Sequence, residues 1–172
     1  GSFLKKISWR KTAEILLYCT LFNLIGALIA GWGFAHSAAF AKLSHESFIS
    51  GVVEMKLGRG NDLVLLEAIL ANVFVNIAIL SFVLIKDSAA KLWIVLSAIY
   101  MFVFLTNEHI AANFASFAIV KFSVAADTIA NFGIGNILRH WGVTFIGNLI
   151  GGGLLIGLPY AFLNKNEDTY VD

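Results

Sequence analysis

A short polar cluster interrupts an otherwise apolar stretch and carries the residues best suited to chemistry. Residues 106–109 read Thr-Asn-Glu-His and stand between two charge-free runs, and Asn113 follows four residues after His109. At this spacing His109 and Asn113 would share one face of a helix. An imidazole can donate a hydrogen bond, accept a proton or release one near neutral pH. The cluster therefore predicts a site that assists a small polar or charged solute.

A small anion of a weak acid fits this chemistry, because a bare carboxylate is costly to move into a medium of low dielectric constant. Protonation of the acid, or transient pairing with a cationic imidazole, removes most of that cost. Glu108 has two possible roles: it could favour the imidazolium electrostatically, or it could cap a helix that starts after the cluster. The alternative for His109 is a buried structural histidine that is bonded to a backbone carbonyl.

A second polar face lies in another apolar run. Asn72 and Asn76 are four residues apart, so they would also lie on one side of a helix. Interhelical hydrogen bonds and the lining of a pore are both open explanations for this pair.

The elements that hold these residues must lie in a membrane. Of the 172 residues 59% are hydrophobic and only 13% are charged, whereas soluble domains are near half and a quarter. A net charge of +1 does not indicate binding to nucleic acid. The single cysteine, Cys19, excludes an intrachain disulfide and a cysteine-based zinc site. No phosphate loop, nucleophile elbow or pair of catalytic carboxylates occurs. We therefore expect no enzyme, no cofactor and no metal site.

The apolar runs predict an all-α membrane protein with four transmembrane helices. A helix needs roughly 20 mostly apolar residues to cross about 30 Å of hydrocarbon. Such spans are expected near residues 13–33, 64–85, 92–121 and 141–163 of a single membrane domain. The third span is too long for a simple crossing and contains the polar cluster. It is therefore expected to be broken near residues 104–109, since irregular backbone at membrane depth must be covered by protein or line a cavity.

Basic residues indicate how the chain crosses the cell membrane. Four spans put both termini on one side, and that side would hold seven basic residues against five on the other. Lys5, Lys6, Arg10 and Lys11 directly before the first span strengthen the bias. Because basic residues concentrate on the cytoplasmic side, we expect a multi-pass protein with both termini in the cytoplasm.

Two outer connections carry minor features. Residues 44–57 predict an amphipathic surface helix with Phe48, Val52 and Met55 on one face. His140 stands between an arginine and a tryptophan, which is typical of an interfacial anchor.

A short motif recurs in the first and last spans. Residues 22–27 read FNLIGA and residues 147–152 read GNLIGG, with Asn23 and Asn148 at mid-span 125 positions apart. The two spans run in opposite directions, as an inverted-topology repeat predicts. The glycines of the last span, namely Gly147, Gly151, Gly152, Gly153 and Gly157, are expected to pack helices closely, and the two asparagines to bond across helices. Partners of the second and third spans would then precede residue 1, so we expect the natural protein to have six spans.

Three motifs resemble one family. Residues 107–114, NEHIAANF, resemble the E-H-S-(I/V)-A-N-M signature of the formate/nitrite transporter family. Residues 147–160 resemble that family's last helix, with its G-N-x-x-G-G motif and aromatic close, and residues 70–72 resemble the L-x-N that opens its fourth helix. The resemblance covers residues 3–165.

The resemblance implies an aquaporin-like helical bundle with an inverted repeat, one pore per protomer and a homopentamer in the lipid bilayer. It implies that His109 is the pore histidine, Asn113 its partner, Asn72 a pore asparagine and Phe102 a constriction, with Glu108 beside them. The family conducts formate, nitrite, hydrosulfide and sometimes lactate. The implied function is a channel or proton-linked symporter for such anions.

The sequence departs from the family at two places. The family's first two helices have no counterpart here, so this chain alone is not expected to conduct. The family also often has an aromatic where Asn107 stands. Two alternatives remain: a haem- or quinone-binding subunit, which would need histidines paired across helices, and a non-conducting structural fragment.

Overall fold

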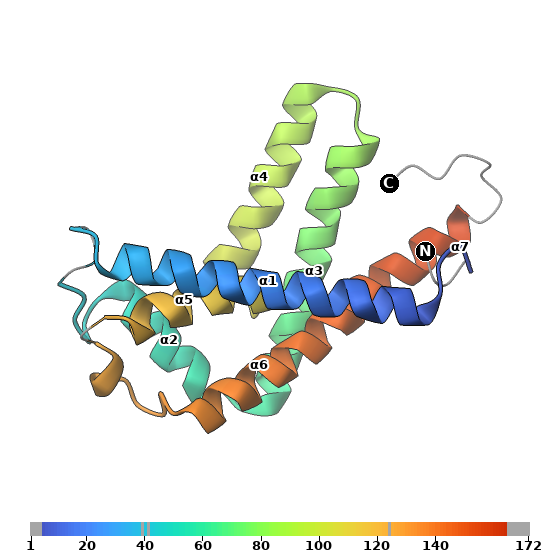
Figure 1. Cartoon of the computed structure of the whole chain (residues 1–172). Coiled ribbons are helices and arrows are strands. Elements are labelled where there is room, and N and C mark those ends of the chain that lie inside the picture. Colours follow the sequence, from blue (N-terminus) through green and yellow to red (C-terminus); the bar gives the residue numbers. More distant parts are fainter. Residues whose placement is uncertain (1–4, 39, 41, 124, 165–172) are drawn as a thin grey trace.

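The computed structural model describes residues 5–38, 40, 42–123 and 125–164, and its regular elements in these ranges are all helical (Figure 1). In chain order they are α1 (Trp9–Ala35), α2 (Phe48–Gly58), α3 (Asn61–Leu84), α4 (Ser88–Phe104), α5 (Ile110–Lys121), the 3-10 turn η2 (Ala126–Thr128), α6 (Ile134–Asn148), the π-helical η3 (Leu149–Gly157) and α7 (Leu158–Leu163).

By length and composition, three helical segments can cross a membrane: α1, α3 and the continuous run of α6, η3 and α7. Two shorter apolar helices, α4 and α5, stand where the third span was expected. The interruption runs from Leu105 to His109, so the predicted break is confirmed. The first span begins earlier than its apolar run because the side chain of Ser8 caps it, accepting a hydrogen bond from the Lys11 N–H at 3.2 Å.

The break contains a strained residue. Thr106 has φ 52°, a left-handed conformation that β-branched residues rarely adopt. Such a residue persists where the surrounding structure holds it in place. The contacts that hold it come from α2 and belong to the candidate site.

Small residues set the closest helix contacts. A Cβ placed on Gly31 of α1 would overlap Ala118 of α5, and one placed on Gly147 of α6 would lie 2.8 Å from the Leu65 carbonyl oxygen of α3. A Cβ on Gly151 would overlap the Ile69 carbonyl in the same way. The packing role predicted for Gly147 and Gly151 is therefore confirmed, and α1 runs along α5 while α6 and η3 run along α3 (Figure 1).

Helix α2 has one exposed face and one buried face. Its Phe48 is 85% exposed, whereas Val53 and Leu57 are buried with residues of α5 and α6. The predicted face, with Phe48 and Met55, is therefore exposed, and the opposite face, which also carries Lys56, is buried. The sequence did not indicate the buried face, because a short apolar helix that folds back into a bundle has the same hydrophobic pattern as one lying on a membrane.

The first helix leaves most of its surface uncovered. Only Gly31 and Ala35 of α1 are buried, and Asn23 is exposed without a hydrogen bond among the residues that the structure describes. The expected interhelical bond therefore forms at Asn148 but not at Asn23.

Candidate functional site

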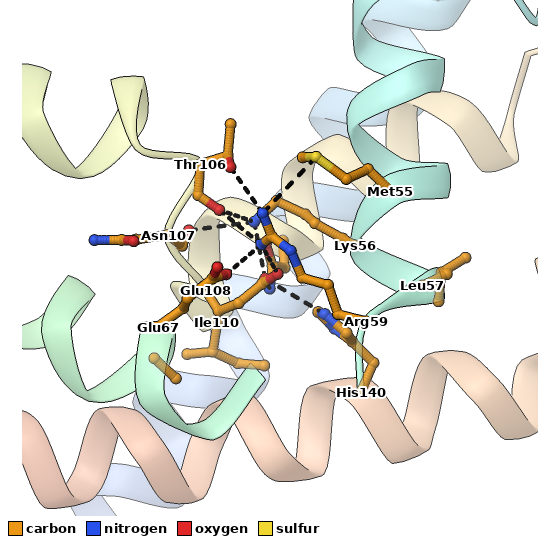
Figure 2. Close-up of polar contacts among 12 residues, drawn as sticks. Met55, Lys56, Leu57, Arg59, Glu67, Thr106, Asn107, Glu108, Ile110 and His140 are labelled. Atoms are coloured by element: carbon orange, nitrogen blue, oxygen red, sulfur yellow. Dashed lines mark hydrogen bonds and ion pairs between the residues drawn. The ribbon is translucent and has the colours of Figure 1, made fainter. Parts of the chain in front are cut away.

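Glu108, in the break between α4 and α5, is the centre of a buried ion cluster. Its side chain is fully buried. Lys56 Nζ lies 2.8 Å from its Oε2 and Arg59 Nη1 lies 2.6 Å from its Oε1. The amide of Asn113 donates to Oε2 at 2.8 Å. Figure 2 shows both cations reaching the carboxylate from the end of α2.

The charges of the cluster balance. Arg59 also forms an ion pair with Glu67 of α3, so two carboxylates face two cations. A buried charge is tolerated when it is paired and hydrogen-bonded, and an unpaired one is costly. The cluster therefore links α2, α3 and the break without leaving a net charge inside the bundle.

The same cations satisfy the backbone of the break. Lys56 Nζ lies 3.1 Å from the Thr106 carbonyl oxygen and 3.2 Å from that of Asn107. Arg59 donates to the Thr106 carbonyl at 3.0 Å and to its hydroxyl at 2.8 Å. Interrupting a helix frees carbonyls that lipid cannot satisfy, and α2 supplies their donors. These contacts explain how Thr106 keeps its left-handed conformation.

Asn148 clamps the other side of the break. Its Nδ2 donates to the carbonyls of Ala68 at 2.8 Å and Glu108 at 2.9 Å, and its Oδ1 accepts from the Ile110 N–H at 2.9 Å. One amide thus satisfies a carbonyl of the break and the first N–H of α5. The hypothesis that Glu108 caps α5 is wrong: its carboxylate is held by the cations, and Asn148 caps the helix.

His109 occupies the N-cap position of α5, and its side chain does not cap the helix. The half-buried ring lies 5.8 Å from the ring of Phe102, centroid to centroid, with the planes tilted by 50°. Among the residues that the structure describes, the ring has no hydrogen-bond partner, so it is not held by a carbonyl. Asn113, expected beside it, directs its amide to Glu108 instead.

The asparagine pair of α3 faces the last span. The Asn72 amide donates to the Asn148 carbonyl, and the Asn76 amide donates to the Asn72 carbonyl at 2.8 Å. A Cβ on Gly152 would overlap the Asn72 amide. Asn72 therefore makes the interhelical hydrogen bond that was one of its two explanations.

His140 is not an interfacial anchor. Its side chain is fully buried, with Nε2 3.4 Å from Glu108 Oε2 and its ring 5.5 Å from that of Phe117. The prediction failed because its arginine and tryptophan neighbours suggested a membrane boundary, whereas the residue faces inward.

Sequence reasoning did not place four members of the cluster: Lys56, Arg59, Glu67 and His140. In the sequence, Lys56 and Arg59 are simply two of the five basic residues on the side opposite to the termini. The usable signal was the presence of Glu108 deep in an apolar stretch, because a buried carboxylate requires cations from elsewhere in the chain. Among the described residues, no three histidine, cysteine, aspartate or glutamate side chains are grouped to hold a metal ion.

The geometry thus joins a helix break, a neutralised carboxylate and an unpaired imidazole, and a sequence profile described as formate/nitrite transporter matches residues 1–162. The chain belongs to the formate/nitrite transporter family. It is accordingly a multi-pass membrane protein of a transporter and channel family, not of an enzyme family. The match gives no support to a haem- or quinone-binding subunit.

Relatives and a solved structure agree with this membership. The uncharacterized transporters YrhG and YwcJ of Bacillus subtilis are 32% and 28% identical, over 96% and 95% of this chain and 60% and 62% of their own lengths. A formate-nitrite transporter of Plasmodium falciparum is 26% identical over 95% of this chain and 54% of its own length. A solved FNT family ion channel matches with TM-score 0.84 and 22% identity over 95% of this chain and 64% of that one, which shows the shared fold.

The chain therefore spans less than two thirds of the length of these relatives.

Proposed function

We propose that the chain forms part of a channel or proton-linked transporter for small monovalent anions of weak acids. Formate and nitrite are the first candidates, and hydrosulfide and lactate are further ones. The observation that carries the proposal is His109: a half-buried imidazole without a hydrogen-bond partner in the described chain, at a helix break beside Phe102.

The electrostatics around His109 support passage of an anion. Glu108 would repel an anion, but its charge is offset by Lys56 and Arg59. The break also exposes the N-terminal end of α5, whose dipole favours negative charge. The imidazole can supply a hydrogen bond or a proton at the point where the solute has lost its water.

The remaining predicted residues have supporting roles in this proposal. Phe102 narrows the path and strips water from the solute, which the ring contact with His109 supports. Asn113 holds Glu108, and Asn72 fixes α3 to the last span beside the path.

We also propose the assembly and orientation expected from the sequence, namely a homopentamer in the cell membrane with both termini cytoplasmic. The broad uncovered face of α1 supports further protein contact, because only Gly31 and Ala35 of that helix are buried. The alternative of a non-conducting fragment applies to the chain in isolation, and anion flux through liposomes of this chain, beside a version that carries the family's six helices, separates the two.

Replacement of His109 tests the function. We expect His109→Ala and His109→Phe, in the complete protein reconstituted into liposomes, to change formate or nitrite flux or its dependence on pH between about 5 and 8. His36→Phe is the matched control, because His36 is exposed at the end of α1. Flux in the two His109 variants that matches the wild type throughout this pH range would contradict the role.

A further inference from the structure

A second histidine meets the ion cluster from a different helix. His140 of α6 is 0% exposed, and its Nε2 lies 3.4 Å from Glu108 Oε2, long for a hydrogen bond but within reach of a small rotation of the ring. Among the residues that the structure describes, neither ring nitrogen has a hydrogen-bond partner. A buried polar ring without partners is costly, so its position requires an explanation.

The charge balance decides which form of the ring fits. The charged residues joined to Glu108, directly or through Arg59, are Lys56, Arg59 and Glu67. With a neutral His140 these two carboxylates and two cations cancel. A protonated His140 would add one uncompensated positive charge to a buried cluster, which is costly. The neutral ring carries one N–H, and the nitrogen that faces Glu108 is Nε2.

A donor at this position would complete the shell around the carboxylate. Lys56 and Asn113 already contact Oε2, each at 2.8 Å, and they approach from α2 and α5. His140 is the contact that reaches this oxygen from α6. Because Asn113 and His140 hold the carboxylate from α5 and α6, it would keep its place even if Lys56 or Arg59 moved while an anion passes.

We propose that His140 is a positioning residue for the proposed transport: its neutral Nε2–H holds the Glu108 carboxylate and thereby fixes the break that presents His109. Only the flux measurement that tests this proposal rests on the proposed function. It assigns His140 no contact with the anion and no change of charge during transport.

Three variants of the complete protein separate hydrogen bonding from packing. His140→Gln keeps a neutral donor, His140→Leu keeps bulk without a donor, and Thr144→Val alters a buried hydroxyl one turn further along α6 that has no partner in the described chain. In liposomes we expect His140→Leu to lower maximal formate flux about tenfold, the loss expected when a buried charged hydrogen bond is removed. We expect His140→Gln and Thr144→Val to keep flux and its pH profile close to those of the wild type.

Three flux results would overturn the proposal. Wild-type flux in His140→Leu would show that no donor is needed. A loss in His140→Gln as large as that in His140→Leu, or a shifted pH profile in His140→Gln, would show that something other than neutral donation matters.

A spectroscopic measurement keeps the test independent of transport. In protein labelled with ¹⁵N-histidine, we expect the resonances absent from His140→Gln to report a neutral Nε2–H tautomer under the conditions of the flux assay and to move in Glu108→Gln. A cationic ring or an Nδ1–H tautomer would refute the inference even if transport is observed. If the wild type carries no anion but these resonances behave as expected, the proposed function fails and the hydrogen bond to Glu108 stands.

Discussion

At the scale of single residues, Glu108 is the position where the loss of a charge should reduce stability most. Replacement by glutamine would leave Lys56 and Arg59 buried with weakened partners, because the neutral amide no longer offsets their charges. We expect Glu108→Gln to lower the free energy of unfolding by about 3 kcal/mol, the range measured when one member of a buried ion pair is removed. Thermal unfolding in detergent would measure this loss.

The matched control is another glutamate in an ion pair. Glu14 pairs with Arg10 on the exposed side of α1, and such pairs contribute about 0–1 kcal/mol. Glu14→Gln should therefore unfold near the wild-type temperature. Equal effects of the two substitutions would mean that the Glu108 cluster contributes no more than a surface pair.

Only some residues of the site could be predicted from the sequence, because the others lie far from Glu108 along the chain. Glu108, His109 and Asn113 stand out because polar residues are conspicuous in an apolar run. Lys56 and His140 lie 52 and 32 positions from Glu108, inside segments with ordinary explanations of their own. Their roles follow from helix packing, which a pattern of residue types does not contain.

At the scale of elements, the contact between α6 and α3 depends on the absence of a side chain at Gly147. A Cβ there would lie 2.8 Å from the Leu65 carbonyl oxygen, so the helices would have to separate. We expect Gly147→Ala to lower the free energy of unfolding by about 1–3 kcal/mol, as overpacking does. The clamp made by Asn148, the next residue, would loosen with it.

Gly142 of the same helix provides the control. A Cβ at this position meets nothing within 4 Å, so Gly142→Ala should leave stability unchanged or raise it through better helix propensity. Unfolding measured for both variants in one detergent tests the contact. A Gly147→Ala protein as stable as Gly142→Ala would show that α3 and α6 are not so closely packed.

The elements differ in how far they could be predicted from the sequence. Helices α1 and α3 could be predicted from their long apolar runs, because a helix must be long to cross the lipid. The break between α4 and α5 could be predicted from the polar residues that interrupt the third run. Helix α2 has 11 residues, and its apolar pattern fits either a membrane surface or a bundle interior. Only the position of its partners decides between them, so its inward-facing Lys56 was missed.

At the scale of the whole molecule, the connections between the described helices lie at two opposite ends of the bundle. The turn between α3 and α4 and the segment between α5 and α6 lie at different ends of the bundle (Figure 1). The basic residues before α1 favour a cytoplasmic start, which places Lys86 in the cytoplasm and Asp127 outside. The orientation can therefore be tested at these two exposed positions.

We expect single cysteines at these positions, in a Cys19→Ser background, to label from opposite sides of intact cells. An impermeant maleimide should modify Asp127→Cys directly and Lys86→Cys only after the membrane is opened, because a charged reagent cannot cross the hydrocarbon. The native Cys19 is removed because it is exposed on α1 and would add background. Labelling of Lys86→Cys but not Asp127→Cys in intact cells would reverse the orientation, and it would place the ends of α2 and α5 that meet Glu108 on the cytoplasmic side of the path.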